Sequence, residues 1–205
     1  MLIVFDMDGV FIEERSSWKI IHKAFGIDNS DIVELYKKGL INDKEFLDRD
    51  IERWRNNGIK RKDIEKILYS VPITNGAEEC IKFLKRIGKI AIISGGIDIL
   101  AKRIAKFGID YIYANGIEFK NEIPWKGILR VPLKEKNKIL ENLMEKLGKE
   151  REEVVVIGDT KYDLCMFKIA GISIAFNPTE EIANKTDYVI KKRDLNELIH
   201  IFENY

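Results

Sequence analysis

The sequence predicts an α/β protein built on a doubly wound, mostly parallel sheet. After residue 73, short apolar runs rich in β-branched residues alternate with helical patterns, as in a parallel sheet with crossover helices. The runs at 2–5, 90–93 and 154–157 are apolar throughout, which is typical of strands buried on both faces. Polar residues and glycine follow each of these runs, so we expect polar side chains to gather at the carboxyl edge of the sheet.

The pattern between residues 11 and 72 is helical without interruption. Apolar spacing and capping residues predict four helices: from Trp18 to near Gly26, over 31–40, from Asn42 to Gly58, and over 62–69. Four helices without a strand do not fit a single crossover connection. We therefore expect a small helical cap, residues 11–72, inserted into an α/β core formed by residues 1–10 and 73–205.

The remaining elements follow in alternation. We expect a helix from Thr74 or Asn75 to Gly88, a strand from Ile90, and a helix over 97–107. A short strand at 111–113 and a β-hairpin within 117–132 come next, with Pro124 and Gly127 disturbing the hairpin arms. The last elements are helices at 136–147, 163–170, 178–184 and from residue 194, and strands at 154–157, 172–176 and 188–190.

Bulk composition excludes several classes of function. The 205 residues carry 35 Lys+Arg against 34 Asp+Glu, a net charge of +1, which is not the basic excess of a nucleic-acid-binding protein. No apolar run is long enough to span a bilayer, and the chain begins in a core strand without a signal-like segment. The two cysteines have no metal-ligand spacing, so we expect free thiols and a cytoplasmic protein.

Two acids directly follow the first strand. Asp6 and Asp8 are separated by one residue and followed by Gly9. Two carboxylates at a buried strand end repel each other unless a cation or a shared proton relieves them, and oxygen ligands suit Mg²⁺. The alternative is a simple polar turn, since Asp and Gly are common turn residues.

Three further features favour a site over a turn. Ser94 and Gly95 end the second buried strand, Asp159 and Asp163 follow the strand at 154–157, and Lys136 lies near the start of the helix before it. These motifs, in this order, resemble the haloacid dehalogenase superfamily of phosphotransferases, most closely its phosphoserine-phosphatase-like branch. The resemblance spans essentially the whole chain and implies a Rossmann-like core.

The resemblance implies a role for each residue. Asp6 would attack phosphorus to form an aspartyl-phosphate, and Asp8 would act as general acid and base while meeting the metal through its backbone carbonyl. Ser94 and the backbone N–H of Gly95 would bind the phosphoryl group. Lys136, which the resemblance selects over Lys134 and Lys138, would be the fixed cation. Asp159 would be a second metal ligand. Asp163 would bind Lys136 or a metal-bound water.

The substrate residues are less well determined by sequence. Phosphoserine-specific relatives use a cap glutamate for the substrate ammonium and a cap arginine for its carboxylate. The matching positions here are Arg15 and Asp50, so both charges appear inverted, while a shift of one residue would restore Glu14 and Arg49. Tyr162 also departs from that branch. These positions predict poor activity on L-phosphoserine.

We therefore expect a Mg²⁺-dependent phosphatase acting on a small phosphorylated metabolite through an aspartyl-phosphate. One alternative is a genuine L-phosphoserine phosphatase. Two others belong to different classes: a phosphoacceptor signalling module, which would lack a second acid at Asp8 and the helical insertion, and a metal-binding protein without turnover.

Overall fold

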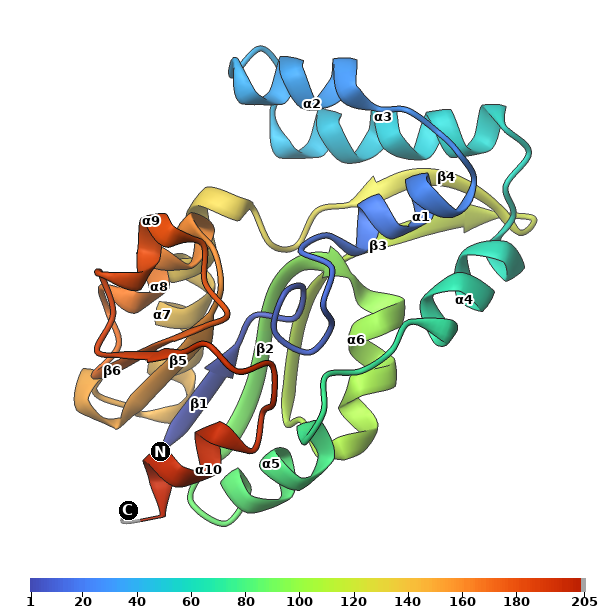
Figure 1. Ribbon diagram of the computed structural model, residues 1–205. Coiled ribbons are helices and arrows are strands. Elements are labelled where there is room, and N and C mark those ends of the chain that lie inside the picture. The colour runs from blue at the N-terminus through green and yellow to red at the C-terminus, as the bar shows by residue number, and fades with distance from the viewer. Residues whose placement is uncertain (204–205) are drawn as a thin grey trace.

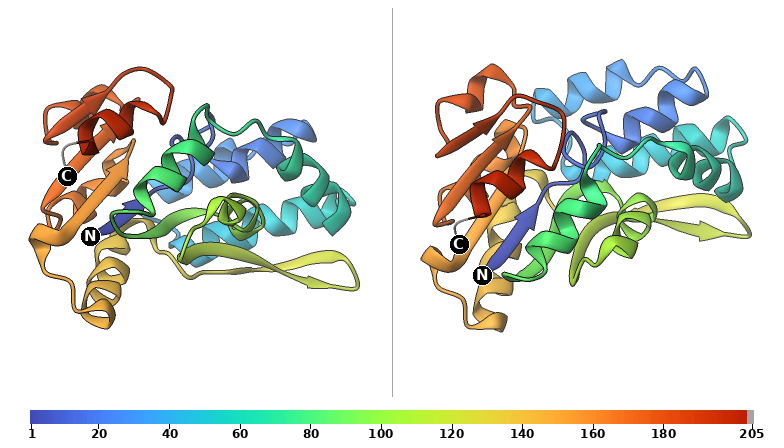
Figure 2. Two further views of the ribbon diagram at one scale, coloured as in Figure 1. Left: turned by 90° about the horizontal axis from the view of Figure 1, so that it is seen from below. Right: turned by 60° about the horizontal axis from the view of Figure 1, so that its bottom comes forward.

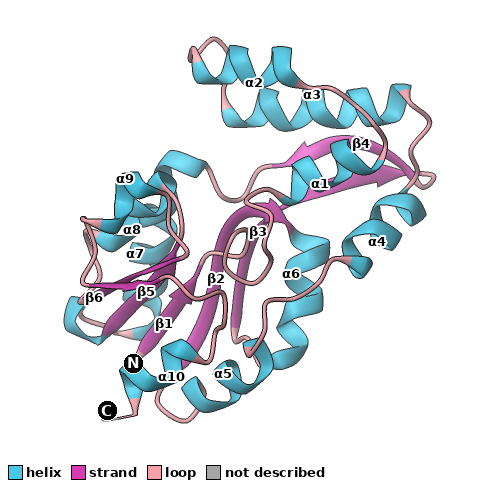
Figure 3. Cartoon of the chain, in the orientation of Figure 1, coloured by secondary structure: helices cyan, strands magenta, loops and turns pink. Residues whose placement is uncertain are grey.

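The computed structural model describes residues 1–203. They contain a seven-stranded sheet with the order β4-β3-β2-β1-β5-β6-β7, drawn in Figures 1 and 3. All neighbouring strands are parallel except β3 and β4. The strands are β1 (Leu2–Phe5), β2 (Lys89–Ile97), β3 (Tyr111–Lys120), β4 (Ile123–Ile128), β5 (Val154–Gly158), β6 (Ile172–Phe176) and β7 (Tyr188–Ile190). The predicted α/β class and doubly wound sheet are confirmed.

Helices cover both faces of the parallel strands. One face packs against α5 (Ala77–Leu84), α6 (Asp98–Ile104) and α10 (Glu197–Phe202), and the other against α7 (Lys136–Leu147), α8 (Leu164–Phe167) and α9 (Glu180–Ala183). The central strand β1 divides its side chains between them, with Ile3 and Phe5 in the first apolar cluster and Leu2 and Val4 in the second. Because β1 is covered on both faces, every one of its side chains is apolar.

The predicted helical insertion lies between β1 and α5. It comprises α1 (Ser17–Ala24), α2 (Ser30–Lys37), α3 (Asp43–Asn56) and α4 (Arg61–Ser70). Asn42 and Glu45 form the capping box expected at the start of α3. Helices α1, α3 and α4 share a third apolar cluster, which includes the stacked rings of Trp18 and Trp54, whose centroids are 5.4 Å apart. Within residues 1–203 no helix has both the length and the apolarity to cross a bilayer.

The hairpin is present, but its first arm differs from the prediction. The short strand expected at 111–113 continues as β3 to Lys120 and then turns back into β4. The turn residues Asn121 and Glu122 both have positive φ, as two-residue hairpin turns of type I′ require. The pairing shifts register beside Pro124, where a missing N–H interrupts the ladder. Figure 2 shows the hairpin extending beyond the parallel strands, alongside α3.

Four short 3₁₀ helices complete the described secondary structure: Ala105–Phe107, Leu133–Glu135, Arg151–Glu153 and Lys161–Asp163. Two of them lie next to the polar edge of the sheet. The segment Leu133–Glu135 leads directly into Lys136, and the segment Lys161–Asp163 follows the polar residues after β5.

Candidate active site

Polar residues gather at the carboxyl ends of three neighbouring strands. Asp6 follows β1, Ser94 lies near the end of β2, and Asp159 follows β5. Strand β1 pairs with both β2 and β5 in parallel, and the backbone N–H of Asp6 donates to Ile157 O at 2.8 Å. These three residues, far apart in the sequence, therefore lie along one edge of the sheet. Their side chains line a single pocket together with Asp8 and Lys136.

Three buried carboxylates form an acidic cluster at this edge. Oxygens of Asp6, Asp159 and Asp163 lie within 4.8 Å of one another. Burial raises the pKa of Asp159 to about 8 and also raises that of Asp6. Gly9, with φ +79°, makes the close approach possible, since a Cβ there would lie 2.0 Å from Asp159 Oδ2. Buried charges this close require a compensating cation or proton.

Lys136 supplies a positive charge that compensates the acidic cluster. Its ammonium, 1% exposed, lies 2.9 Å from Asp6 Oδ2 and 2.8 Å from Asp163 Oδ1. Burial alone lowers the pKa of Lys136, but the carboxylates of Asp163 and Asp6 outweigh it and hold that pKa above its usual value. Asp163 Oδ2 in turn accepts the backbone N–H groups of Asp159 and Thr160. Asp163 therefore fixes both Lys136 and the loop after β5.

Asp8 is held separately from the cluster. Its Oδ2 accepts the backbone N–H of Ser17 at 2.7 Å and the Ser17 hydroxyl at 2.9 Å, and Ser17 Oγ accepts the Ile97 N–H at 2.9 Å. Burial raises the pKa of Asp8 to about 7, while the Ser17 N–H opposes that rise. Asp8 is thus anchored through one oxygen and has a pKa suited to proton transfer near neutrality.

One buried carboxylate oxygen of Asp8 and one of Asp159 are available to a ligand. Among the described residues, Asp8 Oδ1 and Asp159 Oδ1 have no hydrogen-bond partner. Asp159 Oδ2 pairs with Arg15 Nε at 2.9 Å, and Arg15 also donates to Asn177 O. Unpartnered buried carboxylate oxygens beside other carboxylates are a donor set that a hard divalent cation fits.

Ser94 and Gly95 form the wall opposite Asp159. Ser94 is buried and its Oγ accepts the Gly96 N–H at 3.1 Å. The carbonyl of Gly95 accepts Trp18 Nε1 and Asn115 Nδ2, so this turn is tied to α1 and to β3. The strand β2 continues beyond these residues to Ile97, whereas the sequence predicted that it ended at them.

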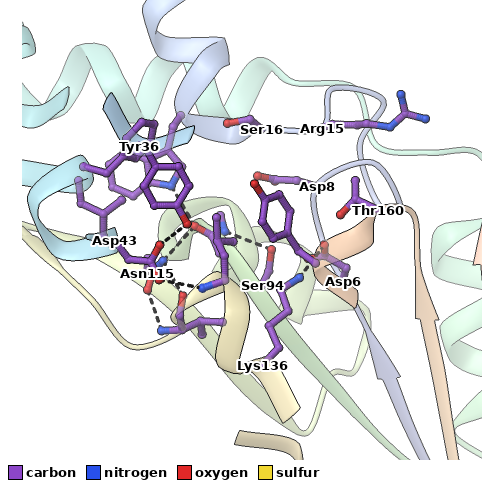
Figure 4. Close-up of a pocket in the computed structure, with 18 of the residues that line it drawn as sticks. Asp6, Asp8, Arg15, Ser16, Tyr36, Asp43, Ser94, Asn115, Lys136 and Thr160 are labelled. Atoms are coloured by element: carbon purple, nitrogen blue, oxygen red, sulfur yellow. Dashed lines mark hydrogen bonds and ion pairs between the residues drawn. The ribbon is translucent and has the colours of Figure 1, made fainter. Parts of the chain in front are cut away.

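The pocket has a volume of about 350 Å³, within the usual range for small-molecule sites. Figure 4 shows Asp6, Asp8, Ser94 and Lys136 on one side and Tyr36 and Asp43 on the other. Tyr36 donates to Asp43 Oδ1 at 2.5 Å, and the Leu133 N–H donates to Asp43 Oδ2 at 3.1 Å. Residues from the helical insertion therefore close the pocket over the polar edge of the sheet.

The predicted substrate residues divide into two pairs. Arg15 and Tyr162 line the pocket. Glu14 lies outside it and pairs with Lys23, and Arg49 is exposed outside it on α3. Glu14 and Arg49, the residues that a one-residue shift in register would place against the substrate, therefore do not line this pocket.

The structure does not bring Arg15 and Asp50, the two positions of the inverted charges, together. Asp50 is fully buried away from the pocket, with its Oδ1 3.2 Å from His22 Nε2 and 3.1 Å from Asn29 Nδ2. Its carboxylate cannot repel a substrate group, because it is used inside the helical insertion. Arg15 points at Asp159 instead of into the pocket centre.

Sequence reasoning missed Ser17, Asn115 and Asp43. Ser17 directly precedes the helix start predicted at Trp18, so its place near a cap was visible but its bonds to Asp8 were not. Asn115 makes four hydrogen bonds, to Gly95 O, Val131 O and the N–H groups of Arg130 and Val131. No local pattern marks it, since its partners come together only in the folded chain.

Comparisons with known proteins agree with this geometry. The family model of haloacid dehalogenase-like hydrolases matches residues 1–171. The phosphoserine phosphatase of Methanocaldococcus jannaschii is 33% identical over 204 residues, covering 97% of this chain and 95% of the relative.

Two solved structures are similar over nearly the whole chain. A substrate-bound phosphoserine phosphatase complex has a TM-score of 0.81 at 30% identity, and a phospho-aspartyl intermediate analogue of phosphoserine phosphatase has 0.81 at 31%. Each alignment covers 98% of this chain and 97% of the other. The chain belongs to the haloacid dehalogenase-like hydrolases, as a phosphatase of the phosphoserine-phosphatase-like branch.

Proposed function

We propose that this phosphatase is a Mg²⁺-dependent phosphomonoester hydrolase in which Asp6 is the nucleophile. The observation that carries the proposal is the placement of Asp6 beside the Lys136 ammonium, at 2.9 Å, in a pocket that also holds Asp8. Residues 11–72 would form the cap that closes this pocket, and residues 1–10 with 73–205 the core that carries the catalytic edge.

Asp6 and Asp159 would hold the metal, with the backbone carbonyl of Asp8 as a further ligand. The unpartnered Oδ1 of Asp159 supports this assignment. Asp163 is less suited, because it accepts two backbone N–H groups besides the Lys136 ammonium, whereas Asp6 accepts one, that of Met7. When bound, Mg²⁺ would neutralise part of the repulsion between the carboxylates and a phosphate dianion.

The chain's own residues divide the reaction into two steps. A carboxylate oxygen of Asp6 attacks phosphorus, and the bond from phosphorus to the alcohol oxygen breaks as Asp8 donates its proton to that oxygen. Asp8 then removes a proton from water, the hydroxide attacks the phosphorus of the aspartyl-phosphate, and phosphate leaves as Asp6 is regenerated. Lys136, Ser94 and the N–H of Gly95 would orient the phosphoryl group and stabilise its charge.

The raised pKa of Asp8 supports its part in this sequence. A carboxyl with a pKa of about 7 holds a proton at neutral pH often enough to donate it, whereas an ordinary aspartate does not. The bonds from Ser17 leave Oδ1 as the oxygen that can carry the proton toward the pocket.

Phosphate release from p-nitrophenyl phosphate tests the proposal. We expect multiple turnovers with Mg²⁺, none after EDTA treatment, and recovery when Mg²⁺ is restored. Asp6→Asn should be inactive yet folded, because the amide keeps the shape of the carboxylate but not its nucleophilicity. A phosphoacceptor module would take up one phosphoryl group without turnover. Full activity after chelation, or turnover by Asp6→Asn, would overturn the proposal.

A further inference from the structure

The half of the pocket away from the catalytic acids has apolar walls. Helices of the insertion and the segment before α7 supply Trp18, Val33, Phe46, Leu47, Val131 and Leu133. The leaving group of a phosphomonoester must lie in this half, because the phosphoryl group occupies the end with Asp6 and Lys136. The apolar walls therefore meet the part of the substrate that distinguishes one phosphomonoester from another.

Three polar groups in that half, Asp43, Asn115 and Trp18 Nε1, are already paired within the protein. Tyr36 OH and the Leu133 N–H each donate to one oxygen of Asp43. The Asn115 side chain uses its donors on two carbonyls and its acceptor on two N–H groups. Trp18 Nε1 donates to Gly95 O. To donate to or accept from one of these three groups, a substrate would have to displace a bond within the protein, which costs binding energy.

Charge in this half also disfavours an ammonium. Asp43 is the only acid lining the pocket beyond Asp6, Asp8 and Asp159 within the described chain, and both its oxygens are occupied. Lys37, on α2 beside Tyr36, lines the pocket and has no ion pair among residues 1–203. A substrate ammonium would be repelled by the Lys37 cation, and at Asp43 it would have to compete with the Tyr36 hydroxyl and the Leu133 N–H that already donate to that carboxylate.

Aromatic rings stand on both sides of the same space. Tyr36 and Phe46 come from the helical insertion, with ring centroids 4.9 Å apart, and Tyr162 comes from the core. Apolar walls flanked by rings favour a flat, apolar group, because rings pack on one another beyond simple area burial. The rings and apolar walls would therefore favour substrates whose leaving group is flat and apolar.

We propose that the natural substrates are phosphomonoesters of apolar, ring-bearing alcohols or phenols that lack an ammonium near the phosphate. The proposal rests on the phosphatase function proposed above and specifies the leaving group. It separates this enzyme from its relatives named for phosphoserine, whose substrate carries an ammonium and a carboxylate on a short chain.

Matched alkyl phosphates test this without changing the chemistry at phosphorus. We compare kcat/KM for 2-phenylethyl phosphate, ethyl phosphate, O-phosphoethanolamine and L-phosphoserine, all esters of primary alcohols. Burial of the ring should favour 2-phenylethyl over ethyl phosphate by about 10–100-fold. O-phosphoethanolamine should not exceed ethyl phosphate, and L-phosphoserine should lie below 2-phenylethyl phosphate.

Two variants test whether the aromatic lining of the pocket causes the preference for the ring-bearing ester. Phe46→Ala should reduce the 2-phenylethyl to ethyl ratio while ethyl phosphate is still hydrolysed, which shows that the fold is retained. Tyr69→Ala, an exposed aromatic on α4 outside the pocket, should leave the ratio unchanged and serves as the control.

The outcomes separate the two proposals. Turnover of p-nitrophenyl phosphate with no preference for the ring, or with L-phosphoserine as the best ester, overturns the substrate inference and leaves the phosphatase function standing. Failure to hydrolyse any of these esters, p-nitrophenyl phosphate included, overturns the proposed function and the inference with it.

Discussion

Replacing Lys136 by Met tests whether this lysine compensates the buried acids. The change keeps the length of the side chain and removes the charge that lies 2.9 Å from Asp6 and 2.8 Å from Asp163. Removing one partner of a buried ion pair costs about 3–5 kcal/mol, because the remaining charges are left unsolvated. We expect a loss of that size in the free energy of unfolding of the metal-free protein at pH 8.

The loss should depend on pH. Burial already raises the pKa of Asp6, and without the Lys136 cation that pKa rises further. At pH 5 the unpartnered carboxyls therefore bind protons and become neutral, so Lys136→Met should destabilise the protein less at pH 5 than at pH 8. Added Mg²⁺ should recover part of the loss at pH 8.

The assay is urea unfolding of metal-free protein at both pH values, with Lys138→Met as the matched control. Lys138 is on the same helix, but its side chain is 63% exposed and pairs with the exposed Glu135, so its replacement should change the free energy of unfolding by about 0.5 kcal/mol or less. Equal losses for the two variants, or a Lys136→Met loss that does not depend on pH, would refute the reasoning.

Two further predictions concern the carboxyls. The pKa values of Asp8, about 7, and Asp159, about 8, are raised above the unfolded value of 3.8. The folded state therefore binds more protons between these limits, and the stability that this contributes is present at low pH and lost as pH rises. We expect the Tm of the metal-free protein to fall between pH 5 and pH 8, with a smaller fall in Asp8→Asn; parallel curves would speak against buried protonated carboxyls. Tyr36→Phe removes the hydroxyl bonded to Asp43 and leaves that carboxylate able to accept an ammonium, so O-phosphoethanolamine should gain about tenfold in kcat/KM relative to ethyl phosphate. An unchanged ratio would mean that the Tyr36 hydroxyl does not block Asp43.

Much of the fold followed from local patterns. Apolar runs, caps and glycines identify the alternating elements, and a parallel sheet necessarily brings strand carboxyl ends to one edge. This explains why Asp6, Ser94 and Asp159, far apart in sequence, could be expected near one another. The extension of β3 to Lys120 was missed, because Ala114 to Gly116 carry no strand pattern of their own and gain it by pairing with β2 and β4.

The lining of the pocket could not be predicted in the same way. The direction of a side chain on the helical insertion depends on how its helices pack against one another. Asp50 turns inward to His22, and Arg15 pairs with Asp159 instead of pointing into the pocket centre. The pairing of Tyr36 with Asp43 joins the end of α2 to the start of α3, and neither residue belongs to a motif. Matching charged positions along the sequence therefore could not identify the residues that Asp50 and Arg15 contact.

The central claim is that Asp6 carries the phosphoryl group, and Asp8→Asn tests it most directly. With p-nitrophenyl phosphate the leaving group needs no proton, so the first step proceeds, while hydrolysis lacks its general base. After rapid acid quenching, intact-protein mass spectrometry should show one added phosphoryl group, and peptide mapping should place it on Asp6. The double variant Asp6→Asn with Asp8→Asn should show none. A phosphoryl group on any other residue, or none on Asp8→Asn under conditions where the wild type turns over, would contradict the account.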